Sequence, residues 1–209
     1  MTILSQLSSQ TGDQTEASNR HVAAHCVEQP DLLLVLGEGL TSSDQALVGD
    51  CAEVFTKVAE QKPKLIASFA DQLIGLFNHK STRVRWEAMH AISLIAPLVP
   101  EQIAPVLSKL SDMIQGDKST IVRDYAIDCL GNYAKASVYT AQEVYPILKS
   151  VLPLWNEKHL ARVLVNLCHV VKSCPSLGLE ILPFAQDYSE HNKSSVKKAA
   201  KRLVKGALL

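Results

Sequence analysis

The stretch STRVRWEAMHAI, residues 81–92, is followed 38 residues later by STIVRDYAIDCL, residues 119–130. The two stretches share the frame Ser-Thr-x-Val-Arg-x-x-Ala-x-x-x, which ends with Ile92 in the first and with Leu130 in the second. A fixed spacing of this length is typical of repeat proteins, in which each copy forms one supersecondary unit. The sequence therefore predicts a helical repeat.

Each copy begins a predicted amphipathic helix, because apolar side chains recur on one helical face, as Val122, Ala126 and Leu130 do. A second predicted helix completes each unit, and these second helices begin at Lys62, Pro100, Ala141 and Ser176. One helical hairpin cannot bury its own apolar face, so the copies must stack and share a core. The predicted fold class is all-α, a right-handed α-solenoid of about four to five stacked helical hairpins.

The predicted organisation is a flexible polar tail over residues 1–14 and a single repeat array over residues 15–209. The tail is polar and has no repeat spacing. The expected units of the array cover residues 15–40, 42–79, 81–117, 119–156 and 158–191, and a closing helix covers residues 194–207.

The repeated stretches resemble the first-helix pattern of HEAT-repeat proteins, Asp/Ser-x-x-Val-Arg-x-x-Ala-x-x-x-Leu-Gly. Residues 119–131 match it almost throughout, including Gly131, and residues 81–93 match it with Ser93 at the glycine position. The resemblance covers residues 42–209, and armadillo arrays are the nearest alternative. It implies a scaffold fold in which the repeated arginines, Arg85 and Arg123, stabilise the stack between adjacent units.

Composition restricts the classes of function. The 209 residues carry 21 Lys plus Arg and 21 Asp plus Glu, a balance that disfavours a dedicated nucleic-acid-binding protein but leaves local patches open. The sequence has neither a signal-like beginning nor a run of 18 apolar residues, so no membrane partner is expected. The five cysteines form no close pairs, which predicts free thiols and a cytoplasmic location, with the nucleus as the alternative.

No motif for catalysis or cofactor binding is present, including a glycine-rich phosphate loop, HExxH and GxSxG. His21 and His25 are spaced as metal ligands on one helical face, but the sequence identifies no third ligand. We therefore expect no catalytic residue, no metal site and no cofactor.

Three candidate surfaces remain. The candidate concave partner surface, on the second helices, comprises Lys64, Gln72, Lys109, Asp112 and Lys149. The candidate anion patch, on the basic closing helix, comprises Lys197, Lys198, Lys201, Arg202 and Lys205. This patch fits either an anion site or a solvated cap that keeps the last repeat soluble. Trp86 is a candidate aromatic anchor for a partner, or else a wedge against the neighbouring repeat.

These features predict a non-enzymatic scaffold or adaptor that binds a protein or peptide along its concave surface. One alternative is a HEAT-like DNA-binding protein of the alkylpurine DNA glycosylase type. That alternative is disfavoured by the zero net charge and by the lack of a Trp-x-x-x-Asp arrangement. A second alternative is a structural or regulatory subunit of a larger assembly.

Overall fold

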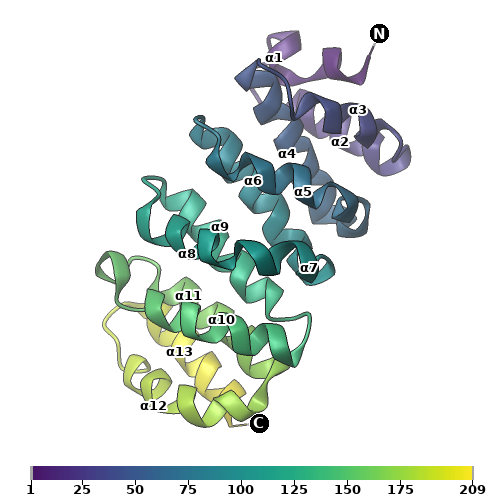
Figure 1. Cartoon of the computed structure of the whole chain (residues 1–209). Coiled ribbons are helices and arrows are strands. Elements are labelled where there is room, and N and C mark those ends of the chain that lie inside the picture. Colours follow the sequence, from purple (N-terminus) through teal and green to yellow (C-terminus); the bar gives the residue numbers. More distant parts are fainter. Residues whose placement is uncertain (1, 209) are drawn as a thin grey trace. The chain divides into compact units, whose positions relative to one another are not determined.

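The computed structural model describes residues 2–208, which form α-helices and short 3-10 helices without a strand (Figure 1). The predicted all-α class is therefore confirmed. The chain divides into two compact units, with the boundary between Val99 and Pro100.

The N-terminal unit places three first helices of successive repeats next to one another: α4 packs against both α2 and α6. Second helices α3 and α5 pack on α4 and α6, respectively. In order, its elements are η1 (Ile3–Gln6), α1 (Ser8–Thr11), α2 (Ala17–Glu28), α3 (Leu32–Gly39), α4 (Gln45–Gln61), η2 (Pro63–Leu65), η3 (Ala67–Phe69), α5 (Ala70–Gly75), η4 (Leu76–Asn78), α6 (Thr82–Ile95) and η5 (Ala96–Leu98).

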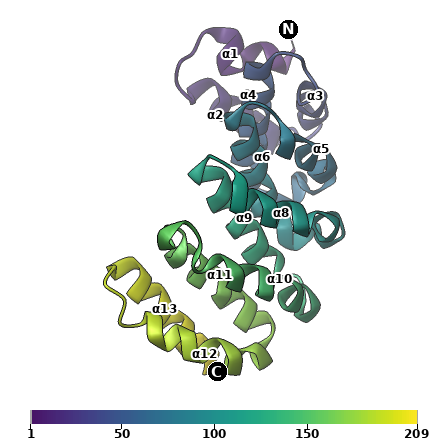
Figure 2. The same ribbon diagram turned by 60° about the vertical axis from the view of Figure 1, so that its left-hand side comes forward.

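The C-terminal unit repeats this arrangement, with α11 packed against both α9 and α13, while α10 and α12 form the other helical layer (Figure 2). In order, its elements are α7 (Pro100–Ile103), η6 (Ala104–Val106), α8 (Leu107–Gly116), α9 (Thr120–Tyr133), α10 (Val138–Val151), η7 (Leu154–Glu157), α11 (Leu160–Ser173), η8 (Pro175–Leu177), α12 (Gly178–Tyr188) and α13 (Ser194–Ala207).

The apolar stripes predicted for the first helices are buried. Val122, Ala126 and Leu130 of α9 have no exposed surface, and the equivalent residues of α6 are buried in the same way. At the start of α9 the Ser119 hydroxyl accepts a hydrogen bond from the Val122 N–H and so caps the helix. Ser81 makes no such bond at the start of α6.

Two second helices are less regular than predicted. The helix expected from Lys62 is divided among η2, η3, α5 and η4, and the helix expected from Pro100 is divided into α7, η6 and α8. In the latter, Pro105 lies within η6, where its missing N–H removes a helical hydrogen bond. Pro146 and Pro183, by contrast, are accommodated inside α10 and α12.

The N-terminal segment is packed rather than tail-like, which corrects the expectation for residues 1–14. Leu7 is fully buried, the Ser8 N–H donates to Asn19 Oδ1 at 2.9 Å, and the Ser9 N–H donates to Asp50 Oδ2 at 2.7 Å. These contacts attach the segment to α2 and α4. Met1 lies outside the described residues. The polar composition hid the contribution of the few apolar residues in this segment.

The turn after α10 has an irregular backbone. The helix ends at Val151, and Trp155, Asn156 and Glu157 have φ values of 55°, 51° and 60°. This left-handed conformation costs roughly 1–2 kcal/mol per non-glycine residue. Contacts on both sides of the turn offset the cost: Trp155 Nε1 donates to the Ile114 carbonyl at 2.9 Å, and Glu157 Oε2 lies 3.0 Å from His191 Nε2.

Helices α9 and α11 approach each other closely at Gly131 of α9. A Cβ atom there would lie 1.9 Å from Asn166 Oδ1 of α11. Asn166 is buried and fixed, since its Nδ2 donates to Asp128 Oδ1 at 2.8 Å and to the Arg162 carbonyl at 3.1 Å. The glycine at this repeat position therefore makes room for a polar side chain from the next repeat.

We expect Gly131→Ala to lower the free energy of unfolding by about 1–3 kcal/mol, because α11 or Asn166 must shift to relieve the overlap. That loss exceeds the gain of up to ~1 kcal/mol that alanine brings to a helix. Urea denaturation followed by circular dichroism measures the difference. Gly116→Ala in α8 is the control, because a Cβ there meets no atom within 4 Å. Equal losses in the two variants would contradict the packing argument.

Candidate functional site

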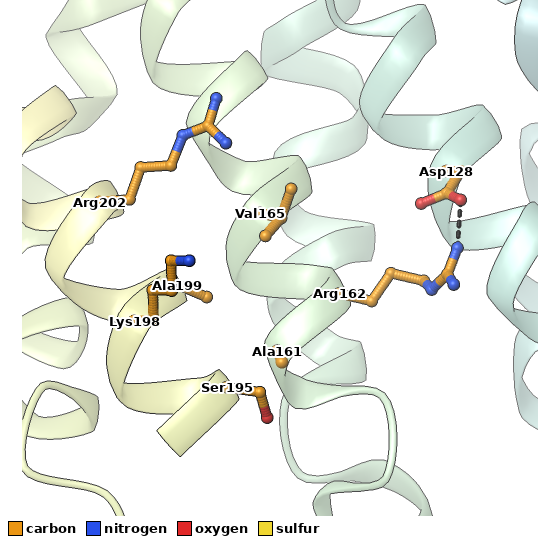
Figure 3. Close-up of a pocket in the computed structure, with 8 residues that line it drawn as sticks. All are labelled: Asp128, Ala161, Arg162, Val165, Ser195, Lys198, Ala199 and Arg202. Atoms are coloured by element: carbon orange, nitrogen blue, oxygen red, sulfur yellow. Dashed lines mark hydrogen bonds and ion pairs between the residues drawn. The ribbon is translucent and has the colours of Figure 1, made fainter. Parts of the chain in front are cut away.

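A pocket of about 500 Å³ opens in the C-terminal unit, along its three first helices. In Figure 3, α13 carries one side of the pocket, α11 carries the middle, and Asp128 of α9 lies at the far side. The lining residues are Asp128, Ala161, Arg162, Val165, Ser195, Lys198, Ala199 and Arg202.

The pocket combines apolar side chains with two free cations. Its apolar lining residues are Ala161, Val165 and Ala199, and Lys198 and Arg202 extend from the α13 side. Both cations are exposed, and no ion pair joins either one to a carboxylate within residues 2–208. The pocket therefore presents positive charge beside an apolar surface.

Arg162 also lines the pocket, but its charge is already compensated. Its Nε atom lies 3.2 Å from Asp124 Oδ1, and its Nη1 atom pairs closely with Asp128 Oδ2 (Figure 3). Burial raises the pKa of Asp128, while hydrogen bonds from Asn166 and Arg162 favour its ionised form. This cluster joins α9 to α11, so we assign Arg162 to the support of the pocket.

A second pocket of about 420 Å³ shares Arg202 with the first, and its other lining residues are Cys168, Val171, Lys172, Pro175 and Gly206. We call the two pockets together the basic groove. The positive environment extends to His169 on α11. Burial, together with the charges of Lys135, Arg202 and Lys172, lowers the pKa of His169 to about 4.

The predicted anion patch is divided in the structure. Lys198 and Arg202 line the basic groove, whereas Lys197 lies 3.6 Å from Glu190. Lys201 and Lys205 are exposed and line neither pocket of the groove. The predicted patch did not include Lys172, because the prediction considered only the closing helix. The sequence of that helix does not indicate which residues of α11 lie beside it.

The residues of the predicted concave partner surface lie on second helices of both units. Lys64 and Gln72 belong to the N-terminal unit, and Lys109, Asp112 and Lys149 belong to the C-terminal unit. Lys149 is engaged, with its ammonium nitrogen 2.6 Å from Glu180 Oε1 and 5.6 Å from the centre of the Tyr145 ring. A common partner surface formed by the five residues stays a prediction.

Trp86 lies on α6 and is partly buried. Its Nε1 atom is enclosed, and no hydrogen-bond acceptor within the described part of the chain reaches it. Trp86 lines a pocket together with Glu87 and Arg83, so its ring does not project freely from the surface. A role for Trp86 as a partner anchor stays a prediction.

Both repeated arginines bond to the turn before their own helices, and Arg123, which donates to the Asp117 carbonyl and the Thr120 hydroxyl, makes further contacts. Arg85 donates to the carbonyl oxygens of His79 and Lys80, in the turn before its own helix. Arg123 is buried and reaches the next repeat: its Nε–H donates to His159 Nε2 at 3.0 Å, and its guanidinium lies 3.8 Å from the centre of the Trp155 ring. Because His159 Nε2 accepts this bond, Nδ1 carries the proton and donates to Asp124 Oδ1 at 2.7 Å.

Four of the five cysteines are buried, whereas Cys168 is partly exposed and His21 is exposed. The five cysteines are free, and burial raises the pKa of the Cys26 thiol to about 11 and that of Cys51 to about 12. The rings of His21 and His25 lie 4.3 Å apart, and residues 2–208 contain no group of three side chains suited to a metal ion. Among the described helices, none has the length and hydropathy that crossing a membrane requires.

No protein-family model and no curated protein matches the chain. Solved structures resemble it in fold. A designed armadillo repeat protein in complex with the peptide (KR)4 has a TM-score of 0.68 at 18% identity, and the match covers 98% of each chain. Importin beta has a TM-score of 0.69 at 13% identity over 99% of this chain and 30% of its own.

An archaeal HEAT-like repeats protein from Thermococcus onnurineus NA1 is also similar, with a TM-score of 0.56 at 11% identity, covering 92% of this chain and 97% of its own. These similarities, together with the stacked first helices, define the chain as an α-helical solenoid of the HEAT and armadillo type. The resemblance to HEAT-repeat proteins seen in residues 81–93 and 119–131 is thereby confirmed.

We expect Arg123→Lys to lower the free energy of unfolding by about 2–4 kcal/mol, because lysine keeps the charge but cannot reproduce the planar fork of bonds. A double-mutant cycle with His159→Gln should give a coupling energy above ~0.5 kcal/mol, as expected for residues in direct contact. Chemical denaturation of the two single variants and the double variant provides the measurement.

The matched cycle pairs Arg85→Lys with His159→Gln, and here the two effects should add within ~0.5 kcal/mol. Additive effects of Arg123→Lys and His159→Gln would count against a role for Arg123 between repeats.

Proposed function

We propose that the protein is a non-enzymatic interaction scaffold and that the basic groove binds an acidic, partly apolar segment of a partner protein. The observation that carries this proposal is the pair of uncompensated cations, Lys198 and Arg202, beside the apolar surface of Val165 and Ala199. Carboxylates of a partner would pair with the cations while apolar side chains cover that surface.

The dimensions of the groove suit a peptide. Its two pockets have volumes of about 500 and 420 Å³, within the range of ligand sites in proteins, and Arg202 stands where they adjoin. A segment in which apolar residues are separated by acidic ones would place one apolar side chain in each pocket. The designed armadillo protein described above carries a basic peptide, and the charge of the groove favours the opposite type of ligand here.

The chemistry of the groove supports binding rather than catalysis. Burial raises the pKa of Cys168, the thiol nearest to Arg202, so it is a poor nucleophile at neutral pH. Desolvation and nearby cations hold the pKa of His169 near 4, so it does not serve as a base at neutral pH. The alternative of DNA binding has less support, because only a few cations gather along the groove.

We expect the full chain to bind a fluorescein-labelled peptide EELEELEE, and Lys198→Glu/Arg202→Glu to weaken binding at least about tenfold, since each reversal replaces attraction by repulsion. Fluorescence anisotropy measures the dissociation constant. Lys201→Glu/Lys205→Glu is the control, because it changes the net charge equally at residues outside the groove.

Equal weakening by the two double variants would show general charge attraction and would contradict binding in the groove. The same titration with a labelled single-stranded 15-mer DNA tests the nucleic-acid alternative. That alternative would be favoured if the DNA bound more tightly than the peptide and if both double variants bound the DNA more weakly than the unchanged chain.

A further inference from the structure

A pocket of about 300 Å³ in the N-terminal unit has the opposite charge. The N-terminal segment covers α4 and α6 there, and we call this site the acidic pocket. Its lining residues are Ser8, Ser9, Asp13, Gln14, Thr15, Glu16, Asp50, Glu53, Arg83, Trp86 and Glu87.

The carboxylates of the acidic pocket outnumber the cations that compensate them. Arg83 Nη2 is shared, since it lies 2.7 Å from both Asp50 Oδ1 and Glu53 Oε2. Lys57 is shared in the same way, with Nζ 3.2 Å from Glu16 Oε2 and 3.8 Å from Glu53 Oε1. The complete set is five carboxylates, Asp13, Glu16, Asp50, Glu53 and Glu87, and three cations, Arg20, Lys57 and Arg83.

Glu53 has an unmet hydrogen bond. Its side chain is only 4% exposed, and its Oε2 atom accepts from Arg83 Nη2 at 2.7 Å and from Asn19 Nδ2 at 3.0 Å. Its other oxygen, Oε1, is buried and receives no hydrogen bond within the described residues. The Lys57 ammonium, 3.8 Å from Oε1, supplies charge but no hydrogen bond, so a cationic donor entering the pocket would be stabilised there.

Glu87 adds a second carboxyl group to the pocket, and a hydrogen bond from Thr56 favours its ionised form. Burial and the nearby charge of Glu53 raise the pKa of Glu87 to about 7, and no cation of residues 2–208 lies within ion-pair distance of its carboxylate. A positive ligand beside Glu87 would favour its ionised form. The indole of Trp86 lines the same pocket and provides an aromatic face beside that charge.

From these contacts we infer that the acidic pocket binds an organic cation with a primary ammonium or guanidinium group. The group comes either from a lysine or arginine side chain of a protein partner or from a small polyamine. An organic cation fits better than a metal ion, because residues 2–208 hold no group of three side chains suited to a metal. This site is separate from the basic groove, which lies in the other unit.

The test is isothermal titration calorimetry of the full chain at pH 8 and pH 6, with spermidine and with the peptide GKGKG as probes. The peptide GQGQG controls for backbone binding, and both peptides are acetylated at the N-terminus, so that lysine side chains supply the only ammonium groups. We expect binding at pH 8 and about tenfold weaker binding at pH 6, because the ionised fraction of Glu87 falls from about 0.9 to about 0.1.

Other groups around the pocket should contribute less to this pH dependence. Burial opposes ionisation of Asp50, but hydrogen bonds from Ser9, Asn19 and Arg83 hold its pKa below the usual value. Hydrogen bonds from Arg20 and Lys57 lower the pKa of Glu16, and hydrogen bonds from Ser18 and Thr15 lower that of Asp13. These carboxylates stay ionised from pH 6 to pH 8.

The variant that tests the site is Glu87→Gln, which keeps the side-chain size and leaves the Arg83 ion pairs in place. We expect it to weaken binding at pH 8 about tenfold and to remove most of the difference between pH 8 and pH 6. Circular dichroism confirms that the variant is folded. Lys198→Glu/Arg202→Glu should leave binding unchanged, so failure of the acidic pocket and failure of the basic groove can be told apart.

The source of the cation follows from the probes. Binding of GKGKG without spermidine indicates a side chain of a protein partner, and the reverse indicates a polyamine. The inference is overturned if neither probe gives measurable heat at millimolar concentration, or if Glu87→Gln binds as the unchanged chain does. Competition by an equal concentration of magnesium chloride would also overturn it, since that outcome means unspecific screening.

Discussion

The close packing of first helices is the contact on which the rest of the structure depends. In the N-terminal unit α4 packs between its neighbours α2 and α6, and in the C-terminal unit α11 packs between α9 and α13. Each of these helices has one apolar face that its own hairpin cannot cover, so the neighbouring repeat completes the core. The approach depends on small residues such as Ala88, Ala126 and Gly131. Where the helices pack closely, even polar side chains of one repeat are buried by the next, as Asn166 is.

The same stacking explains why charge collects between repeats. Asp50 and Glu53 of α4 are held by Arg83 of α6, and Asp128 of α9 is held by Arg162 of α11. Each ion pair satisfies a partly buried charge, and each leaves an imbalance beside it: an excess of carboxylates in the acidic pocket and an excess of cations in the basic groove. A chain with no net charge can therefore carry two sites of opposite sign, each formed by helices of different repeats.

The sequence was sufficient for the features that repeat. The stretches beginning at Ser81 and Ser119 predicted the helices, their buried stripes and the fold class, because a recurring frame implies a recurring environment. Features that occur once were missed. The N-terminal segment packs through isolated residues such as Leu7, and the turn at Trp155 adopts left-handed angles at three successive residues, of which only Asn156 is of a type that favours them. The sequence pointed to the groove residues on α13, Lys198 and Arg202. It did not point to the α11 residues such as Lys172, because these become neighbours of α13 only in the folded chain.

The pairing of Gly131 with Asn166 also limits how freely such a chain can be rearranged. Repeats are often treated as cassettes that can be duplicated, deleted or exchanged, since each one touches only its neighbours. Here the glycine belongs to one cassette and the asparagine that fills its space belongs to the next. The equivalent position of the preceding copy holds Ser93, whose hydroxyl donates to the His90 carbonyl of its own helix. If the copy with Ser93 were placed next to α11, the serine side chain would enter the space that Asn166 occupies. A repeat could therefore be exchanged only together with the residues of the next repeat that pack against it.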